Sequence, residues 1–342
     1  TSGTTGQPKG VMLTHLGVVH SAMHFEQAMG LQRGERVILT VPASHVTGLV
    51  AILLTTVRVA GCNILMRSFA VDEFLRLAAA ERLTYTVMVP AMYNLCLLRA
   101  DFDAYDLSAW RIGAYGGAPM PVATIARLRE KLPGLRLMNA YGATETTSPT
   151  TVMPAEYTEL YPDSIGKVLP CADVRIMNDR GQEVPPGEVG ELWIAGPMVA
   201  PGYWNDPEAS EKSFVAGYWR SGDAGSIDAD GFVRIHDRIK DMIIRGGYNV
   251  YSAELENVIY NCPGVTECAV VGQPDPVLGE KIHAIVYSAD GSVDAARIRS
   301  FCAERVADYK VPDFVTIRLE PLPRNANGKI LKAQLRAQVA GD

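Results

Sequence analysis

The chain has 342 residues, a length that favours two domains with sizeable cores. Its 32 basic and 38 acidic residues give a formal charge of −6 without a basic cluster, which argues against nucleic acid or an anionic membrane as the main partner. The longest apolar run, 49–59, contains two threonines and an arginine and is shorter than the roughly 20 residues that span a bilayer. No integral membrane segment is therefore expected.

The six cysteines are scattered along the chain without a C-x-x-C pair. This pattern is typical of reduced thiols in a cytoplasmic protein rather than of disulfides or a zinc site. A homo-oligomer is considered as a further partner arrangement.

Between His15 and Tyr141, helical patterns alternate with short apolar runs typical of buried strands. Strands are predicted at Val37–Val41, Cys62–Met66, Thr86–Val89, Arg111–Tyr115 and Leu135–Ala140, and helices at about 15–29, 48–60, 71–82, 90–99 and 120–132. Such a βα repeat predicts a largely parallel, doubly wound α/β sheet.

The pattern changes between Ser164 and His236, where short β runs are broken by glycine and proline. Examples of these runs are Ala172–Met177, Glu188–Ile194 and Phe232–Ile235. They predict a small antiparallel sheet or barrel.

A third pattern follows the charged stretch 237–241. It predicts a compact α+β fold with strands at Met242–Ile244, Thr266–Val271, Lys281–Tyr287 and Phe314–Leu319, and with helices that begin near Ser252 and Asp294. We therefore expect an α/β core over 1–150, an antiparallel β subdomain over 151–236, a hinge at 237–241 and a small α+β domain over 242–342.

The first ten residues form a loop rich in glycines and hydroxyl groups. Three glycines allow backbone N–H groups to approach an anion, and four hydroxyls and one lysine add donors and a charge. The loop is not a Walker motif, because Pro8-Lys9-Gly10 stands where Gly-Lys-Ser/Thr would be. We expect it to bind phosphates through Thr1, Ser2, Gly3, Thr4, Thr5, Gly6 and Lys9.

This loop resembles the phosphate loop of the adenylate-forming (AMP-binding, or ANL) superfamily, which includes acyl-CoA synthetases, luciferases and the adenylation domains of peptide synthetases. Members of that superfamily carry a long segment before this loop, and no methionine precedes Thr1 here. The resemblance therefore implies an N-terminally truncated member. Its expected parts are the remnant of a large doubly wound α/β domain, a small β-barrel subdomain and a small α+β C-terminal domain.

Tyr141-Gly142-Ala143-Thr144-Glu145 follows a predicted strand, at the edge of the sheet where open α/β folds bind ligands. Thr144 and Glu145 supply the hydroxyl and carboxylate oxygens that Mg²⁺ prefers when it is bound with substrate phosphates. Glu145 is our candidate for the metal contact. The resemblance implies that Tyr141, beside Gly142, stacks on adenine.

Two further segments follow predicted strands of the same sheet. Gly116-Gly117-Ala118 leaves a flat ligand free to lie against the backbone, and the resemblance implies that it walls the adenine and acyl sites. His45 matches a family position that gates the acyl site. A single histidine is otherwise often a satisfied core residue, so both interpretations of His45 stay open.

The remaining motifs lie toward the C-terminus. Asp223 resembles the family's ribose ligand, an acidic acceptor for a vicinal diol, and Arg238 resembles the residue that reaches the same ribose or the phosphate. Lys240 corresponds to the family's hinge. Gly246 and Gly247 correspond to glycines that line the channel for the pantetheine arm of coenzyme A. Lys329 corresponds to the lysine that bridges carboxylate and phosphate oxygens during adenylation.

Together the motifs imply an acyl-CoA synthetase that uses ATP, Mg²⁺, coenzyme A and a small-molecule carboxylic acid. The residues near His45, Ala91 and Tyr115 are mostly small or apolar, which favours a fatty or aryl acid. Activation of an amino acid is the alternative within the superfamily, but no acidic residue for a substrate ammonium lies between Val41 and Leu65. Luciferase-like oxygenation and an inactive nucleotide-binding fragment are the others.

Overall fold

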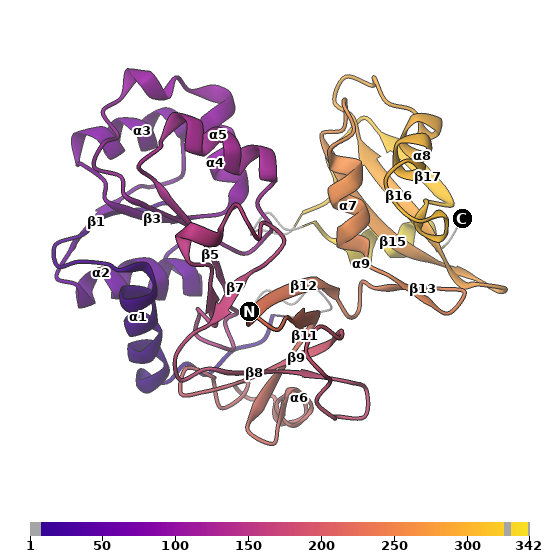
Figure 1. Ribbon diagram of the computed structural model, residues 1–342, viewed down its shortest axis with the longest axis horizontal. Coiled ribbons are helices and arrows are strands. Elements are labelled where there is room, and N and C mark those ends of the chain that lie inside the picture. Colours follow the sequence, from indigo (N-terminus) through magenta and orange to yellow (C-terminus); the bar gives the residue numbers. More distant parts are fainter. Residues whose placement is uncertain (1–7, 325–329, 341–342) are drawn as a thin grey trace. The chain divides into compact units, whose positions relative to one another are not determined.

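The computed structural model describes residues 8–324 and 330–340. The chain forms two compact units (Figure 1). Of the described residues, the larger unit contains Gly10–Ser221 and Ser226–Ile235, and the smaller contains Pro8 and Lys9, Gly222–Gly225 and those from His236 onward. Each unit is described by itself below.

A parallel sheet forms the first half of the larger unit. Its strands lie in the order β2-β1-β3-β4-β5, with every neighbouring pair parallel. This order, which reverses between β1 and β3, is that of a doubly wound sheet. The strands are β1 (Arg36–Leu39), β2 (Cys62–Leu65), β3 (Tyr85–Met88), β4 (Ile112–Tyr115) and β5 (Arg136–Tyr141).

Helices cover both faces of this parallel sheet (Figure 1). Val87 and Met88 of β3 show why, because successive strand residues point to opposite faces and these two belong to different apolar cores. Met88 packs with α3 (Val71–Ala80), α4 (Pro90–Arg99) and α5 (Val122–Lys131), whereas Val87 packs with α1 (His15–Met29) and the π-helix η1 (Thr47–Leu54). The short helix α2 (Thr55–Arg58) continues η1, and η2 (Phe102–Ala104) follows α4.

Antiparallel strands continue the same sheet beyond β5. The order runs on through β6-β7-β12-β11-β9-β8, and β10 pairs with β11. The predicted antiparallel strands are therefore present, but they extend the parallel sheet through the β5–β6 pair. The elements of this part are β6 (Thr151–Val152), η3 (Ala155–Tyr157), β7 (Gly166–Val168), β8 (Asp173–Met177), β9 (Gly190–Ala195), α6 (Pro207–Ser213), β10 (Phe214–Val215), β11 (Tyr218–Ile227) and β12 (Phe232–Arg238).

The smaller unit is an α+β fold. Its sheet has the order β14-β13-β16-β15, and β17 pairs in parallel with β16. Helices α7 and α8 pack on the face that Val270 enters, and α9 packs on the face that Val271 enters. The elements are β13 (Ile243–Arg245), β14 (Tyr248–Val250), α7 (Ser252–Tyr260), β15 (Glu267–Asp275), β16 (Gly279–Tyr287), α8 (Ala295–Ala303), η4 (Asp308–Lys310), β17 (Phe314–Arg318) and α9 (Lys332–Val339).

These elements confirm the expected fold class, a mixed α/β sheet followed by a small α+β fold. In the part of the chain that the structure describes, no helix combines the length and apolar character that crossing a bilayer requires.

Candidate functional site

The larger unit brings three of the predicted segments to one edge of its sheet. His45 follows β1, Gly116 follows β4, and Tyr141 ends β5. Since β1, β4 and β5 run parallel, their carboxyl ends share the edge at which ligands of open α/β sheets bind. The fold therefore places these segments where a shared site is expected.

Gly116 and Gly117 have different structural reasons to be glycine. A Cβ atom on Gly116 would lie 2.3 Å from the carbonyl oxygen of Ala140, so β4 can approach β5 this closely only without a side chain. Gly117 has a φ of +78° and open space around its Cα. Gly117 and the exposed Ala118 thus leave room for a ligand, whereas Gly116 is also required by the sheet.

Tyr141 and Gly142 link the parallel and antiparallel parts of the sheet. The half-buried Tyr141 packs against the apolar clusters that contain Trp219 and Val233. A Cβ atom on Gly142 would lie 3.0 Å from the Cα of Ser148, so the chain returns closely past this point. Packing fixes the position of Tyr141.

Glu145 is a buried carboxylate with one side-chain partner among the described residues. Only 7% of the residue is exposed, and its Oε1 accepts a hydrogen bond of 3.0 Å from the hydroxyl of Tyr203. Burial and, next, the nearby Glu145 carboxylate raise the pKa of Tyr203 to about 12, so the hydroxyl stays a donor near neutral pH. No hydrogen bond reaches the second carboxylate oxygen of Glu145 from any described residue.

Tyr203 also ties Glu145 to the segment that follows the phosphate loop. Tyr203 forms an antiparallel bridge with Val11, and the N–H of Trp204 donates to the carbonyl of Gly10 over 2.6 Å. Sequence analysis missed Tyr203, because 58 residues separate it from Glu145 and no local pattern marks the contact.

The predicted loop residues Thr1, Ser2, Gly3, Thr4, Thr5 and Gly6, and also Lys329, lie outside the described residues. Lys9 is half-buried. Among the described residues, no three histidine, cysteine or carboxylate side chains gather to hold a metal ion. The single carboxylate of Glu145, with half-buried Thr144 beside it, fits an Mg²⁺ ion that arrives with nucleotide phosphates, because that ion needs only one or two protein carboxylates.

His45 contacts the first residue of η1 through its Nδ1 atom. Its Nδ1 accepts a 3.3 Å hydrogen bond from the backbone N–H of Thr47 and lies 3.1 Å from the Thr47 hydroxyl oxygen. The helix predicted at 48–60 begins instead as the π-helix η1, at Thr47, two residues after His45. The hydroxyl of Thr55 donates to the carbonyl of Val50, five residues earlier, and so supports the wider turn.

The smaller unit brings together Asp223 of β11 and Arg238 at the end of β12. Arg238 Nε lies 2.8 Å from Asp223 Oδ1, and 6% of the Asp223 side chain is exposed against 49% for Arg238. The predicted ribose residues are therefore an ion pair within strands rather than separate loop groups.

Lys240 is exposed and lies in the turn after β12, where the N–H of Met242 donates to the carbonyl of Arg238 over 3.0 Å. Gly246 and Gly247 form the two-residue turn between β13 and β14, with φ values of +59° and +84°. This geometry favours glycine at both positions for conformational reasons alone. A Cβ atom on Gly247 would contact nothing within 4 Å, so this side of the turn is open.

Comparisons with known proteins place the chain in one family. The model "AMP-binding enzyme" matches residues 1–204, and "AMP-binding enzyme C-terminal domain" matches residues 254–329. Feruloyl-CoA synthase of Amycolatopsis is 38% identical over 98% of this chain and 68% of its own length. A long-chain-fatty-acid–CoA ligase of Mycobacterium tuberculosis is 38% identical over 99% of this chain and 66% of its own length.

A solved relative has the same fold. The o-succinylbenzoate CoA synthetase of Bacillus subtilis, in complex with ATP and a magnesium ion, matches with a TM-score of 0.90 and 34% identity over 99% of this chain and 68% of that chain. Its complex with an acyl-adenylate intermediate matches with a TM-score of 0.91. The chain thus spans about two thirds of the length of these relatives. It belongs to the AMP-binding enzyme family, in the acyl-CoA ligase branch of the adenylate-forming superfamily.

Proposed function

We propose that the protein is an AMP-forming acid–CoA ligase that works through an acyl-adenylate. The observation that carries this proposal is Glu145, a buried carboxylate that Tyr203 holds by one oxygen while no described residue binds the other. A carboxylate of this kind, next to the stem of a phosphate loop, suits a metal ion delivered with ATP. The magnesium complex of the Bacillus subtilis relative supports the same assignment.

In the first half-reaction, Thr1–Gly6 and Lys9 would bind the phosphates, Tyr141 the adenine, and Asp223 and Arg238 the ribose or the α-phosphate. Glu145 would hold Mg²⁺, with Thr144 beside it, and the ion supplies charge neutralisation on the phosphate oxygens. An oxygen of the substrate carboxylate attacks the α-phosphorus, and the bond to pyrophosphate breaks. Lys329 bridges carboxylate and phosphate oxygens as their negative charges approach each other.

In the second half-reaction, the thiolate of coenzyme A attacks the acyl carbonyl, and AMP leaves with the bonding electrons. Rotation at Lys240 withdraws Lys329 and brings Gly246 and Gly247 to the pantetheine arm. The open side of the turn at Gly247 supports this role.

We propose a fatty or aryl acid as the substrate and the cytoplasm as the location. The relatives named above are a feruloyl-CoA synthase, a long-chain-fatty-acid–CoA ligase and an o-succinylbenzoate CoA synthetase, so their names share coenzyme A but not one acid. His45, which follows β1, is the proposed residue at the acyl site.

The test is ATP–pyrophosphate exchange by the complete protein with a panel of fatty, aryl and amino acids, followed by detection of acyl-CoA. We expect exchange that depends on a fatty or aryl acid, and thioester formation when coenzyme A is added. Exchange with amino acids alone would assign the protein to amino-acid activation. ATP binding without exchange for any acid would identify a nucleotide-binding protein instead.

A further inference from the structure

Lys332, at the start of α9, makes a pair of close polar contacts with α7. Its Nζ lies 2.6 Å from Glu256 Oε1 and 2.8 Å from the hydroxyl oxygen of Ser252. Ser252 and Glu256 are four residues apart on α7 and therefore share one face of that helix. Only 17% of the Lys332 side chain and 22% of the Glu256 side chain are exposed.

Asp237, in the predicted hinge segment, binds the same end of α7. Its Oδ2 accepts hydrogen bonds from the hydroxyl of Ser252, over 2.7 Å, and from the backbone N–H groups of Ser252 and Ala253. The N-cap residue of α7, Tyr251, makes no side-chain hydrogen bond to the helix. Asp237 therefore caps α7 from a distant segment, and Ser252 connects it to Lys332.

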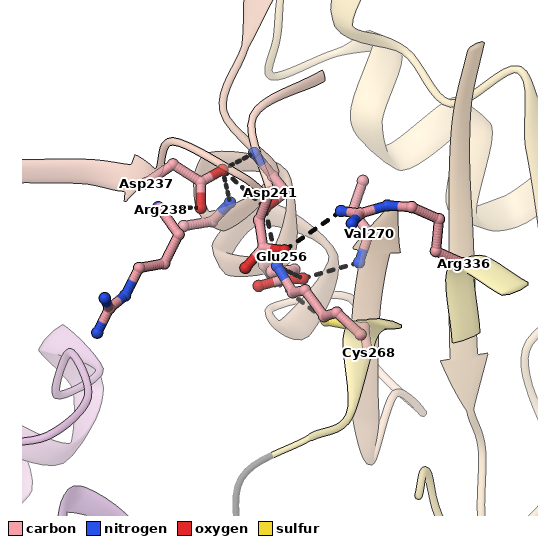
Figure 2. A network of polar contacts seen from close by, with 10 residues as sticks. Asp237, Arg238, Asp241, Glu256, Cys268, Val270 and Arg336 are labelled. Carbon is pink, nitrogen blue, oxygen red and sulfur yellow. Dashed lines mark hydrogen bonds and ion pairs between the residues drawn. The ribbon is translucent and has the colours of Figure 1, made fainter. Parts of the chain in front are cut away.

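Glu256 and Arg336 add two more links. The N–H of Val270, on the edge strand β15, donates to Glu256 over 2.7 Å. Arg336, one turn after Lys332 on α9, lies 3.2 Å from Asp241 Oδ1 at the end of the hinge segment. Figure 2 shows Asp237, Asp241 and Glu256 within this single network of contacts.

The described residues on either side of 325–329 contact each other in the same unit. Arg324 bridges to Ile330, and its guanidinium lies 2.8 Å from Glu267. The N–H of Leu331 donates to the carbonyl of Pro323 over 2.8 Å, directly before Lys332.

Burial by itself lowers the pKa of Lys332, but the carboxylates of Glu256 and Asp237 outweigh it and raise that pKa, so the ammonium stays charged.

We propose that Lys332 is a positioning residue for the first half-reaction. Through Ser252 and Asp237, Lys332 attaches the start of α9 to the hinge segment. It thereby limits where Lys329, three residues earlier in the chain, can be placed. This inference rests on the proposed function of Lys329. A partly buried ion pair is weak evidence for a gain in stability, because desolvation offsets much of the attraction. We infer instead that the contacts of Lys332 favour one arrangement of α7, α9 and the hinge segment.

The test is the double variant Lys332→Met/Glu256→Gln. It removes both charges of the Lys332–Glu256 pair together, so neither the ammonium nor the carboxylate is left without its ionic partner, and the glutamine oxygen can still accept from Val270. Three quantities are measured: the unfolding midpoint, the kcat and ATP KM of pyrophosphate exchange, and thioester formation from preformed acyl-adenylate. We expect kcat of exchange to fall about 10- to 100-fold, as for a misplaced catalytic group. ATP KM and thioester formation should stay within about twofold.

The matched control is Lys310→Met/Glu254→Gln. Lys310 Nζ lies 2.7 Å from both carboxylate oxygens of Glu254, which is also on α7, but this pair joins η4 rather than α9. Both half-reactions should be unaffected in the control. Unchanged exchange in the Lys332 variant, or an equal loss in both half-reactions, would overturn the positioning role.

A second variant covers the case in which the double variant does not fold. Lys332→Arg keeps a cation that can donate to Glu256 and Ser252, and it should retain folding and most of the exchange activity. A folded Lys332→Arg protein that loses thioester formation as strongly as exchange would overturn the inference. Absence of exchange in the wild-type protein would instead reject the proposed function itself.

Discussion

Glu145 in the larger unit and Glu256 in the smaller unit are both glutamates with little exposure, but they have opposite surroundings. Glu145 accepts one neutral hydrogen bond, from Tyr203, and no described residue binds its other oxygen. Glu256 is satisfied by the ammonium of Lys332 and by the N–H of Val270. A buried carboxylate with an oxygen that no described residue binds is suited to bind a ligand. A carboxylate whose oxygens are already bound by protein groups is suited to connect parts of the protein.

The comparison extends to the neighbours of each glutamate. Tyr203 reaches Glu145 from the segment that pairs with Val11, so the fold joins the carboxylate to the stem of the predicted phosphate loop. Lys332 reaches Glu256 from α9 and joins it to the hinge segment through Ser252 and Asp237. The same residue type therefore serves binding in one unit and positioning in the other.

The largest effect is expected for Glu145→Gln. The amide oxygen can still accept from Tyr203, so the free energy of unfolding should change by less than about 1 kcal/mol. Loss of the anionic metal contact should reduce Mg²⁺-dependent pyrophosphate exchange by about 10²- to 10³-fold. The test measures pyrophosphate-exchange kinetics and a denaturation curve on the same sample. Near-normal exchange would show that Glu145 does not bind the metal.

The next effect concerns the hinge. Lys240→Pro fixes φ at this position and should reduce thioester formation by about 10²-fold while exchange survives, if the locked arrangement is the adenylating one. Lys240→Ala, which keeps the backbone freedom, is the control and should retain both half-reactions. Normal thioester formation in the proline variant would place the hinge elsewhere.

The contrast with Glu145 is sharpened by the single variant Glu256→Gln. This variant leaves the largely buried ammonium of Lys332 without its ionic partner. We therefore expect the free energy of unfolding of the smaller unit to fall by about 2 kcal/mol. Urea unfolding followed by a probe in that unit measures the loss. Equal stability losses for Glu145→Gln and Glu256→Gln would remove the distinction between the two glutamates.

A smaller effect is expected for Tyr203→Phe. The phenyl ring keeps the packing but loses the hydroxyl that orients Glu145, so the Mg²⁺ concentration for half-maximal exchange should rise about tenfold. ATP binding without metal should be unaffected, which equilibrium titration can check. A fall in exchange rate with no change in Mg²⁺ dependence would show that Tyr203 does not act through Glu145.

The sequence predicted the elements whose signals are local. The apolar runs of β1 to β5 and the helical patterns between them are visible without knowledge of the fold, and the observed boundaries lie close to the predicted ones. The π-helix η1 was not predicted, because its apolar sequence resembles that of an ordinary α-helix. The hydrogen bond from Thr55 to Val50, which supports the wider turn, is visible only in the structure. The strand β11 was missed because Gly222 and Asp223 interrupt its apolar alternation.

The candidate site was predictable wherever a motif carried it and not where a distant contact did. Glu145, Asp223 and Arg238 are predicted from their motifs and stay predictions as site residues, and the structure adds that the last two form an ion pair. Tyr203 and Lys332 were missed, because an isolated tyrosine or lysine has no pattern that reveals its partner. The helix α9 has only eight residues, too few for a clear periodic signal.

The central claim is that the protein forms an acyl-adenylate and passes its acyl group to coenzyme A. The most direct measurement incubates the complete protein with ATP, Mg²⁺ and a fatty or aryl acid without coenzyme A, and identifies the bound product by mass spectrometry. We predict bound acyl-AMP with release of pyrophosphate, and its conversion to acyl-CoA and AMP once coenzyme A is added. A Lys329→Ala variant should fail to form acyl-AMP but still convert it when it is supplied. Hydrolysis of ATP to ADP and phosphate, or no acyl-AMP despite bound ATP, would contradict the account.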